Sequence, residues 1–393
     1  MLRSLFSGIS GLRSHQTMMD VTGNNIANVN TNGFKSSSVQ FQDTLSQMLR
    51  AAGAPQGATA GSNPSQVGLG VRVAGVTTNF GQGSAQQTGR SLDLMVNGDG
   101  FFVAKSVNET LYTRAGAMTF DINGTLINSE GLKIQGWQAD PATGQISTTA
   151  GVGDIKLPIS TLMQPQATTE TVFEGNLPGD AAVGTTLPAS IDVFDAQGTK
   201  STLSVTFRKD DADTWSVLEG TTVLGTVDFT AGGASHTTTP ATLTSASGIS
   251  LDLATVTGFS GTTSIKTSSQ DGYQVGSLTA FTIGPDGVLT GIFSNGLKQP
   301  VAQIATATFA NVAGLEKAGG SMYRTTVNSG TARIGAPGLD DRGALSSGML
   351  EMSNVDLAAE FTNLIVAQRG FQANSRVITS SDELLQDLVN LKR

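Results

Sequence analysis

The two ends of this 393-residue chain carry the pattern that decides its fold. Residues 1–30 read MLRSLFSGISGLRSHQTMMDVTGNNIANVN, in which apolar side chains recur at spacings of three and four. The apolar positions of this repeat are Leu2, Leu5, Ile9, Leu12, Met19 and Ile26. Such a heptad pattern predicts an amphipathic helix over about residues 3–28, with one apolar seam facing a partner helix.

A matching pattern closes the chain. Residues 351–393 read EMSNVDLAAEFTNLIVAQRGFQANSRVITSSDELLQDLVNLKR. One seven-residue column holds Leu357, Leu364, Phe371, Ile378 and Leu385, and a second holds Phe361, Gln368, Ser375, Asp382 and Val389. Ser353 and Asp356 form a capping box, so we expect the helix to begin near Asn354. Ser380 and Ser381 mark the place where a break would fall.

Between these ends the apolar period changes from seven to two. Gly-containing turns flanked by alternating apolar residues predict hairpins at 119–128 and 281–293. A further β region is expected over 171–265, and the Thr-, Ser-, Ala- and Gly-rich stretch 230–268 favours edge strands and long loops. The predicted fold class is therefore mainly β with α-helical termini.

Composition narrows the function. The chain has no Cys, which excludes disulfides and thiolate chemistry, and its formal net charge of -8 argues against a nucleic-acid partner. The first residues lack the apolar core of a cleaved signal peptide, and no run of 18 apolar residues predicts insertion into a membrane. Export, if it occurs, is expected to use a route without a cleaved signal.

Two apolar seams on one chain create a burial problem. They can pair with each other, but the C-terminal column is longer, so apolar surface remains for copies of the same protein. A contact between two different patches of identical subunits propagates into an open helical filament unless the ring closes. The alternative is an intramolecular helical hairpin, as in a monomeric surface binding module or adhesin.

Three stretches resemble one known family. Residues 23–35 read GNNIANVNTNGFK, and the segment 68–137 contains GLGVRVAGVTTNF, TGRSLDLMVNGDGFFV and LYTRAGAMTFDINGTLINSEGLKIQGW. Together with 351–393, they are similar to the axial proteins of the bacterial flagellum, the rod and hook subunits. The matched signature residues are Asn24, Asn25, Ala27, Asn28, Gly33, Phe34, Lys35, Gln368 and Arg369.

Within that family the chain resembles hook subunits more than the distal rod subunit, which is shorter. About 130 residues separate Trp137 from Asp271, room for the outer domain that hook subunits carry. Some spirochaete hook subunits are cross-linked through a cysteine, and this chain lacks one. The resemblance thus implies a structural subunit of the flagellar hook that assembles without that cross-link.

The resemblance also implies an architecture and partners. N- and C-terminal helices would pair as a coiled coil lining a channel, with nested, discontinuous β domains outside it. The implied segments are 1–30 with 350–393 (coiled coil), 31–67 with 343–349 (connection), 68–140 with 271–342 (inner β domain) and 141–270 (inserted outer β domain). Implied partners are copies of itself, rod subunits at the base, hook-filament junction proteins at the tip, the hook cap protein and the flagellar type III export apparatus.

No motif predicts an enzyme, a cofactor or a metal site. His15 and His236 lack the neighbours of a catalytic triad, and Gly68-Leu69-Gly70 lacks the helix-opening context of a dinucleotide site. The carboxylates in the β region fit solvated turns better than a calcium loop; they are Asp195, Asp210, Asp211 and Asp213.

Overall fold

The structure is a computed structural model that describes residues 2–54, 61–140, 144–158, 162–229, 233–234 and 236–390. The chain forms two compact units. The first contains Met1–Leu157, Thr282–Thr290 and Pro300–Arg393, and the second contains Pro158–Phe281 and Gly291–Gln299. Both chain ends belong to the first unit, as the predicted nesting requires. The mainly β fold with helical termini is confirmed.

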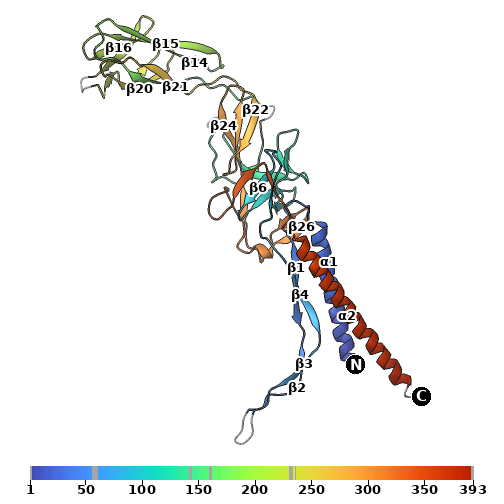
Figure 1. The fold of residues 1–393 in the computed structure, drawn as a ribbon. Helices are drawn as coiled ribbons and strands as arrows, with labels where there is room; N and C mark the ends of the chain where they lie inside the picture. Colours follow the sequence, from blue (N-terminus) through green and yellow to red (C-terminus); the bar gives the residue numbers. More distant parts are fainter. Residues whose placement is uncertain are drawn as a thin grey trace. The chain divides into compact units, whose positions relative to one another are not determined.

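Two helices lie side by side at the chain ends, α1 over Leu2–Ala27 and α2 over Leu357–Asn390 (Figure 1). The predicted start of α2 near Asn354 is wrong, because Asp356 caps the helix instead. Its Oδ1 accepts the backbone N–H groups of Ala358 and Ala359 at 2.9 and 3.2 Å. The helix runs unbroken through the two serines, since Ser381 Oγ donates to the carbonyl of Val377.

A β ribbon lies against α1. Strand β1 (Ser37–Asp43) pairs antiparallel with β4 (Val71–Thr78), and β2 (Ser46–Arg50) pairs with β3 (Ser65–Gly68). Ser10 Oγ of α1 accepts the backbone N–H of Val71 at 3.2 Å. α1 is therefore held on two sides, by α2 and by the ribbon.

The largest sheet has 13 strands, in the main order β22-β23-β24-β11-β7-β8-β27-β26. Aromatic side chains including Phe101, Trp137 and Tyr323 fill a core on it. Its strands are β7 Phe101–Lys105, β8 Thr110–Thr113, β9 Met118–Phe120, β10 Leu126–Asn128, β11 Lys133–Gln138, β12 Gly153–Asp154, β22 Leu278–Ile283, β23 Val288–Phe293, β24 Lys298–Ile304, β25 Thr306–Thr308, β26 Glu316–Gly319, β27 Met322–Arg324 and β28 Arg333–Gly335. Both predicted hairpins are confirmed, as the pairs β9-β10 and β22-β23.

Smaller elements of the first unit bring the chain back toward α2. Strand β6 (Leu94–Asn97) pairs with β29 (Ala344–Ser347), and β5 (Ala85–Gln87) pairs with β30 (Met349–Glu351). A 3-10 turn covers Val312–Gly314. Because β30 ends at Glu351, the C-terminal segment leaves the strands just before α2 begins.

The second unit contains two sheets around one core. The first sheet follows chain order, with β14 Thr186–Phe194, β15 Lys200–Lys209, β16 Thr214–Glu219, β17 Thr222–Asp228 and β18 Thr237–Thr239. The second runs β19-β20-β13-β21, with β13 Glu170–Asn176, β19 Leu243–Thr244, β20 Ser250–Thr257 and β21 Lys266–Gln270. Buried Phe173, Phe207 and Trp215 fill the core.

The expectation of edge strands in the Thr- and Ser-rich stretch is confirmed for β18 and β19 but not for β20. The Thr- and Ser-rich stretch contains β20, which is an internal strand with β19 on one side and β13 on the other. β20 runs parallel to β13, and its Leu251, Leu253 and Val256 are buried. Three apolar residues on the inner face are enough to make a central strand out of a polar-looking segment.

Candidate assembly surface

Small and polar side chains make much of the contact between α1 and α2, together with Ile378 of α2, which packs on Gly8 of α1. On α2, Ala367 and Ser381 are buried against α1, and Glu360 Oε1 accepts a hydrogen bond from Asn25 Nδ2 at 2.9 Å. A Cβ on Gly11 would lie 2.7 Å from Asn374 Oδ1, and one on Gly370 would lie 2.5 Å from the His15 ring. The two backbones thus approach closely because glycines leave room for Asn374 and His15.

The predicted apolar columns lie partly within this contact, at Ile378, and partly at exposed positions. Leu5, Ile9, Leu12, Met19 and Ile26 of α1 are half-buried, and the side chain of Leu2 lies outside the described residues. On α2, Leu364, Ile378 and Leu385 are half-buried, whereas Leu357, Phe361 and Phe371 are exposed. The helix pair therefore leaves Leu357, Phe361 and Phe371 of the α2 seam exposed, whereas no described seam residue of α1 is exposed.

Exposed apolar residues on α2 extend beyond the predicted set. Phe361 is 50% exposed and Ile365 57% exposed, and Val366, Val377 and Leu384 are also exposed. On α1, Phe6 is 65% exposed. Phe361 and Ile365 lie one turn apart and form an exposed apolar stripe on α2, whereas Val366, Val377 and Leu384 lie on another side of the helix. Apolar surface exposed in this way on an otherwise weakly charged chain indicates a contact with another molecule.

The signature residues form the turn that ends α1. Asn25 is buried and joins three segments, because its amide also binds both backbone groups of Ser37 at 2.8 and 3.0 Å. Asn28 Nδ2 donates to the carbonyl of Asn24 at 2.9 Å, which closes the last turn of the helix. Ala27 and Asn24 are exposed, and so are Gln368 and Arg369 on α2.

Gly33 and Phe34 continue the same turn. Gly33 has φ +67, and a Cβ there would lie 2.6 Å from the backbone nitrogen of Ala115, so no other residue fits without a shift. Phe34 carries the Lys317 ammonium 5.2 Å above its ring. These residues of the motif thus pack the turn against the β strands in a specific way.

Lys35, the last residue of the N-terminal motif 23–35, is fully buried. Its ammonium donates to Glu351 Oε1 at 2.5 Å and to the carbonyl of Gly81 at 2.9 Å. Arg114 lies on the other side of Glu351, with Nη1 3.5 Å from Oε2. Neither Arg114 nor Glu351 is predicted as a site residue from the sequence. The available signal was the charge of Glu351 among Met349, Leu350 and Met352 in a chain that is only 14% charged.

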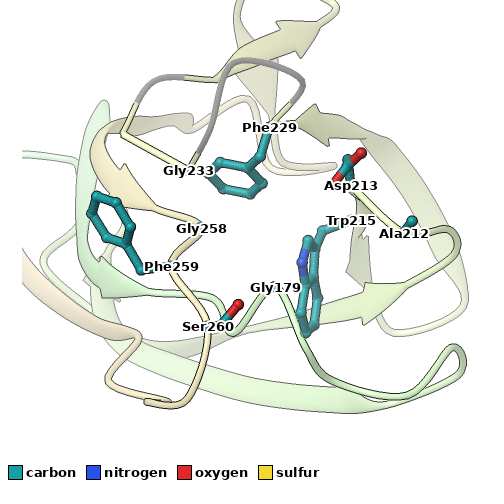
Figure 2. Close-up of a pocket in the computed structure, with 9 residues that line it drawn as sticks. All are labelled: Gly179, Ala212, Asp213, Trp215, Phe229, Gly233, Gly258, Phe259 and Ser260. Carbon is teal, nitrogen blue, oxygen red and sulfur yellow. The ribbon is translucent and has the colours of Figure 1, made fainter.

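Two hollows lie away from the helices. Figure 2 shows the one in the second unit, about 280 Å³, with Phe229, Trp215 and Phe259 around it. Trp215 is only 1% exposed, and the Lys209 ammonium already lies 5.4 Å from its ring, so little ring surface remains for a ligand. The other hollow, about 570 Å³, opens in the first unit beside Tyr112 and a Thr-rich loop at 325–331.

Within the described parts of the chain, no three His, Asp or Glu side chains gather as a metal site would need. Among the same residues, no helix is long and apolar enough to cross a bilayer. The predicted turn carboxylates behave as expected for loops: Asp195 Oδ1, for example, accepts the N–H groups of Gln197 and Thr199.

The chain has two paired terminal helices, a signature turn at the end of α1, an exposed apolar stripe on α2 and β units between the helices in sequence. These features define a class of self-assembling axial subunit. Comparison with known families agrees: residues 5–35 match the flagella basal body rod protein family, 95–172 match the flagellar hook protein FlgE/F/G D1 domain, and 346–391 match the flagellar basal body rod FlgEFG protein C-terminal family. The chain belongs to the family of flagellar hook and basal-body rod proteins.

The relatives include both hook proteins and a rod protein. The chain is 40% identical to the flagellar hook protein FlgE of Borreliella burgdorferi and 38% identical to that of Treponema pallidum, over 100% of both chains in each case. It is also 35% identical to the flagellar basal-body rod protein FlgG of Bacillus subtilis, over 100% of both chains.

A solved structure shares the fold. The flagellar hook protein FlgE2 of Helicobacter pylori matches with a TM-score of 0.52, covering 68% of this chain and 99% of that one at 15% identity.

Proposed function

We propose that this chain is the structural subunit of the bacterial flagellar hook, and that it assembles with its own copies into a curved, flexible tube coupling rod to filament. The observation that carries the proposal is the exposed apolar stripe on α2, which remains after α1 and α2 have paired. Identity of 40% to a hook protein over the whole chain supports the same assignment.

The helices and the β units pack differently, so we assign them different mechanical roles. Helices that pack knobs-into-holes resist twisting about a tube axis, so they transmit torque. β units with cores of their own move against their neighbours with little loss of buried area, so they permit bending. The four-part division into 1–30/350–393, 31–67/343–349, 68–140/271–342 and 141–270 is the corresponding domain proposal.

The other partners follow from the position of a hook. We assign rod subunits to its base, hook-filament junction proteins to its tip, the hook cap protein to its growing end, and the type III export apparatus to its delivery without a cleaved signal. The assembled subunit would then lie outside the cell envelope. Its role is structural rather than enzymatic, in keeping with relatives named as hook and rod proteins.

Electron microscopy of the purified, polymerised protein tests the assignment. We expect curved tubes, whose curvature or flexibility changes when about residues 139–268 are deleted. Straight rods would favour the distal rod subunit, which the Bacillus subtilis relative makes the second candidate. Isolated particles under every assembly condition would instead support a monomeric binding module and overturn the proposal.

A further inference from the structure

Three ionisable side chains meet in a dry site where both helices join the strands. Lys35 follows the signature turn, Arg114 follows β8, and Glu351 ends β30. The Lys35 and Glu351 side chains are 0% exposed and that of Arg114 is 4% exposed. These segments are far apart in sequence, so the site exists only when the N-terminal motif, the sheet and the approach to α2 are all in place.

Glu351 is the centre of the cluster. Its Oε1 accepts both the Lys35 ammonium and the backbone N–H of Gly83, the latter at 2.9 Å. Its backbone carbonyl accepts the N–H of Gly33 at 2.8 Å. Arg114 also lies 5.1 Å above the Phe101 ring, which connects the cluster to the aromatic core.

Asn354 adds a second set of contacts three residues further on. Its Oδ1 accepts the backbone N–H of Ser36 at 2.8 Å, and its Nδ2 donates to the carbonyls of Asn79 and Gly81 at 2.8 and 3.1 Å. The last residues before α2 are therefore fastened to the first residues after the α1 turn.

Stability alone does not explain such a site. Two cations share one carboxylate, and Arg114 Nε and Nη1 and Glu351 Oε2 lack hydrogen-bond partners. Burial lowers the pKa of Lys35, although Glu351 acts in the opposite direction. Apolar residues of similar volume are often as stable as a buried ion pair, whereas a charged or polar group in such a position can fix a unique register.

We propose that Lys35, Arg114 and Glu351 form an entry clasp that positions α1 against α2, and that regular assembly depends on this clasp more than the stability of the unit does. The reason a clasp is needed lies in the contact between α1 and α2. Small residues such as Gly8, Gly11 and Ala367 add little apolar area to the helix contact, so contacts outside it contribute to holding α1 on α2. The inference rests on the proposed assembly function.

A neutral clasp tests this directly. In the triple variant Lys35→Met, Arg114→Met, Glu351→Gln, the amide oxygen at 351 still accepts the Gly83 N–H and no charge stays buried. With Trp137 as the sole tryptophan, in a Trp215→Phe background, and excitation selective for tryptophan, we expect the melting midpoint of the first unit to stay within about 4 °C of the parent. We expect the critical concentration for assembly to rise at least about tenfold, a change that corresponds to about 1.4 kcal/mol, with irregular polymers in micrographs.

Two further variants complete the design. Glu351→Gln alone leaves two buried cations unpaired, so it should lower both the melting midpoint and assembly. Should the triple variant fail to fold, Asn354→Ala decides, because Asn354 holds the same segment next to the clasp. It must raise the critical concentration at least about tenfold while the midpoint falls by no more than about 4 °C. Normal tubes from a folded triple variant, or from Asn354→Ala in that event, overturn the clasp. Failure of the parent to form tubes would instead count against the proposed function.

Discussion

The helix pair and the second unit use their apolar residues in opposite ways. The second unit keeps Phe173, Phe207 and Trp215 in a core of its own, closed by two sheets. The helices contact each other mainly through small and polar residues, with Ile378 packed on Gly8, and leave Phe361 and Ile365 largely exposed. One region is complete as a folded body, whereas the other presents the surface on which another molecule has to pack.

That difference separates stability from assembly. Substitutions in the second unit should change its free energy of unfolding and leave the helix contacts between copies intact. Substitutions on the outer stripe of α2 should change assembly much more than the stability of the monomer, because at least half of each of those side chains is exposed. Each variant below tests one side of this separation.

The largest effect is expected on assembly. Replacing Phe361 and Ile365 with Asp should raise the critical concentration at least about 100-fold, since each buried apolar side chain contributes about 1.5–3 kcal/mol and a charge is added. Light scattering and sedimentation measure the critical concentration. The melting midpoint of the monomer should not change.

The matched control adds the same negative charge at neighbouring exposed positions. Thr362→Asp with Asn363→Asp adds two carboxylates without removing apolar area. We expect this pair to assemble within about tenfold of the parent, because exposed charges are screened and contribute about 0–1 kcal/mol each. Equal losses in both double variants would show that charge, not the apolar stripe, governs assembly.

Sequence periodicity predicted the helices and hairpins but only part of the assembly surface. Heptad spacing shows that Phe361 and Leu364 lie near one face, yet it weights apolar residues and overlooks Gly11 and Gly370, whose lack of a side chain makes the close contact. The approach to α2 was misjudged because Asn354 binds across the chain, a long-range contact that no local pattern encodes. Glu351 and Arg114 were missed for the same reason.

The next largest effect concerns the core of the second unit. Phe207 is fully buried with its ring 5.9 Å from that of Phe173, so Phe207→Ala should lower the free energy of unfolding of this unit by about 3–5 kcal/mol. Urea unfolding followed at Trp215, in a Trp137→Phe background, measures it. Assembly at low temperature should persist.

A control in the same unit is Phe259→Ala, because Phe259 is half-exposed. It should lower the free energy of unfolding by less than about 1 kcal/mol. If Phe207→Ala abolished assembly while the unit remained folded, the proposed independence of the two regions would be wrong.

A smaller effect is expected at the helix contact. A Cβ on Gly370 would lie 2.5 Å from the His15 ring, which is itself packed 5.8 Å from the ring of Phe41, so Gly370→Ala should weaken helix docking by about 1–3 kcal/mol. Gly23, in the same class of helical glycine, has open space around its Cβ position, and Gly23→Ala should strengthen α1 by about 0.5–1 kcal/mol.

Thermal loss of helix circular dichroism in the assembled protein measures both changes. Adding His15→Ala to Gly370→Ala should recover most of the loss, because the clashing ring is then gone. Opposite signs for the two glycines are the expected result. A gain at Gly370 would mean that α2 is not in contact with α1 there.

The smallest effect is an acid sensitivity of the second unit. The Arg208 guanidinium, helped by the Ser216 hydroxyl, holds the pKa of Asp210 below its usual range. Because the folded pKa lies below the unfolded value of about 3.9, the contribution is present above that pH and disappears as pH falls through the folded pKa. The pair is partly exposed, so screening limits its contribution to the free energy of unfolding to under about 1 kcal/mol.

Two variants test this contribution. Asp210→Asn should make the unfolding free energy, followed at Trp215, less dependent on pH between about 5 and 2, and Arg208→Gln should move the transition upward in pH. An unchanged profile in both variants would remove Asp210 from the account and leave the stability of this unit to its apolar core alone.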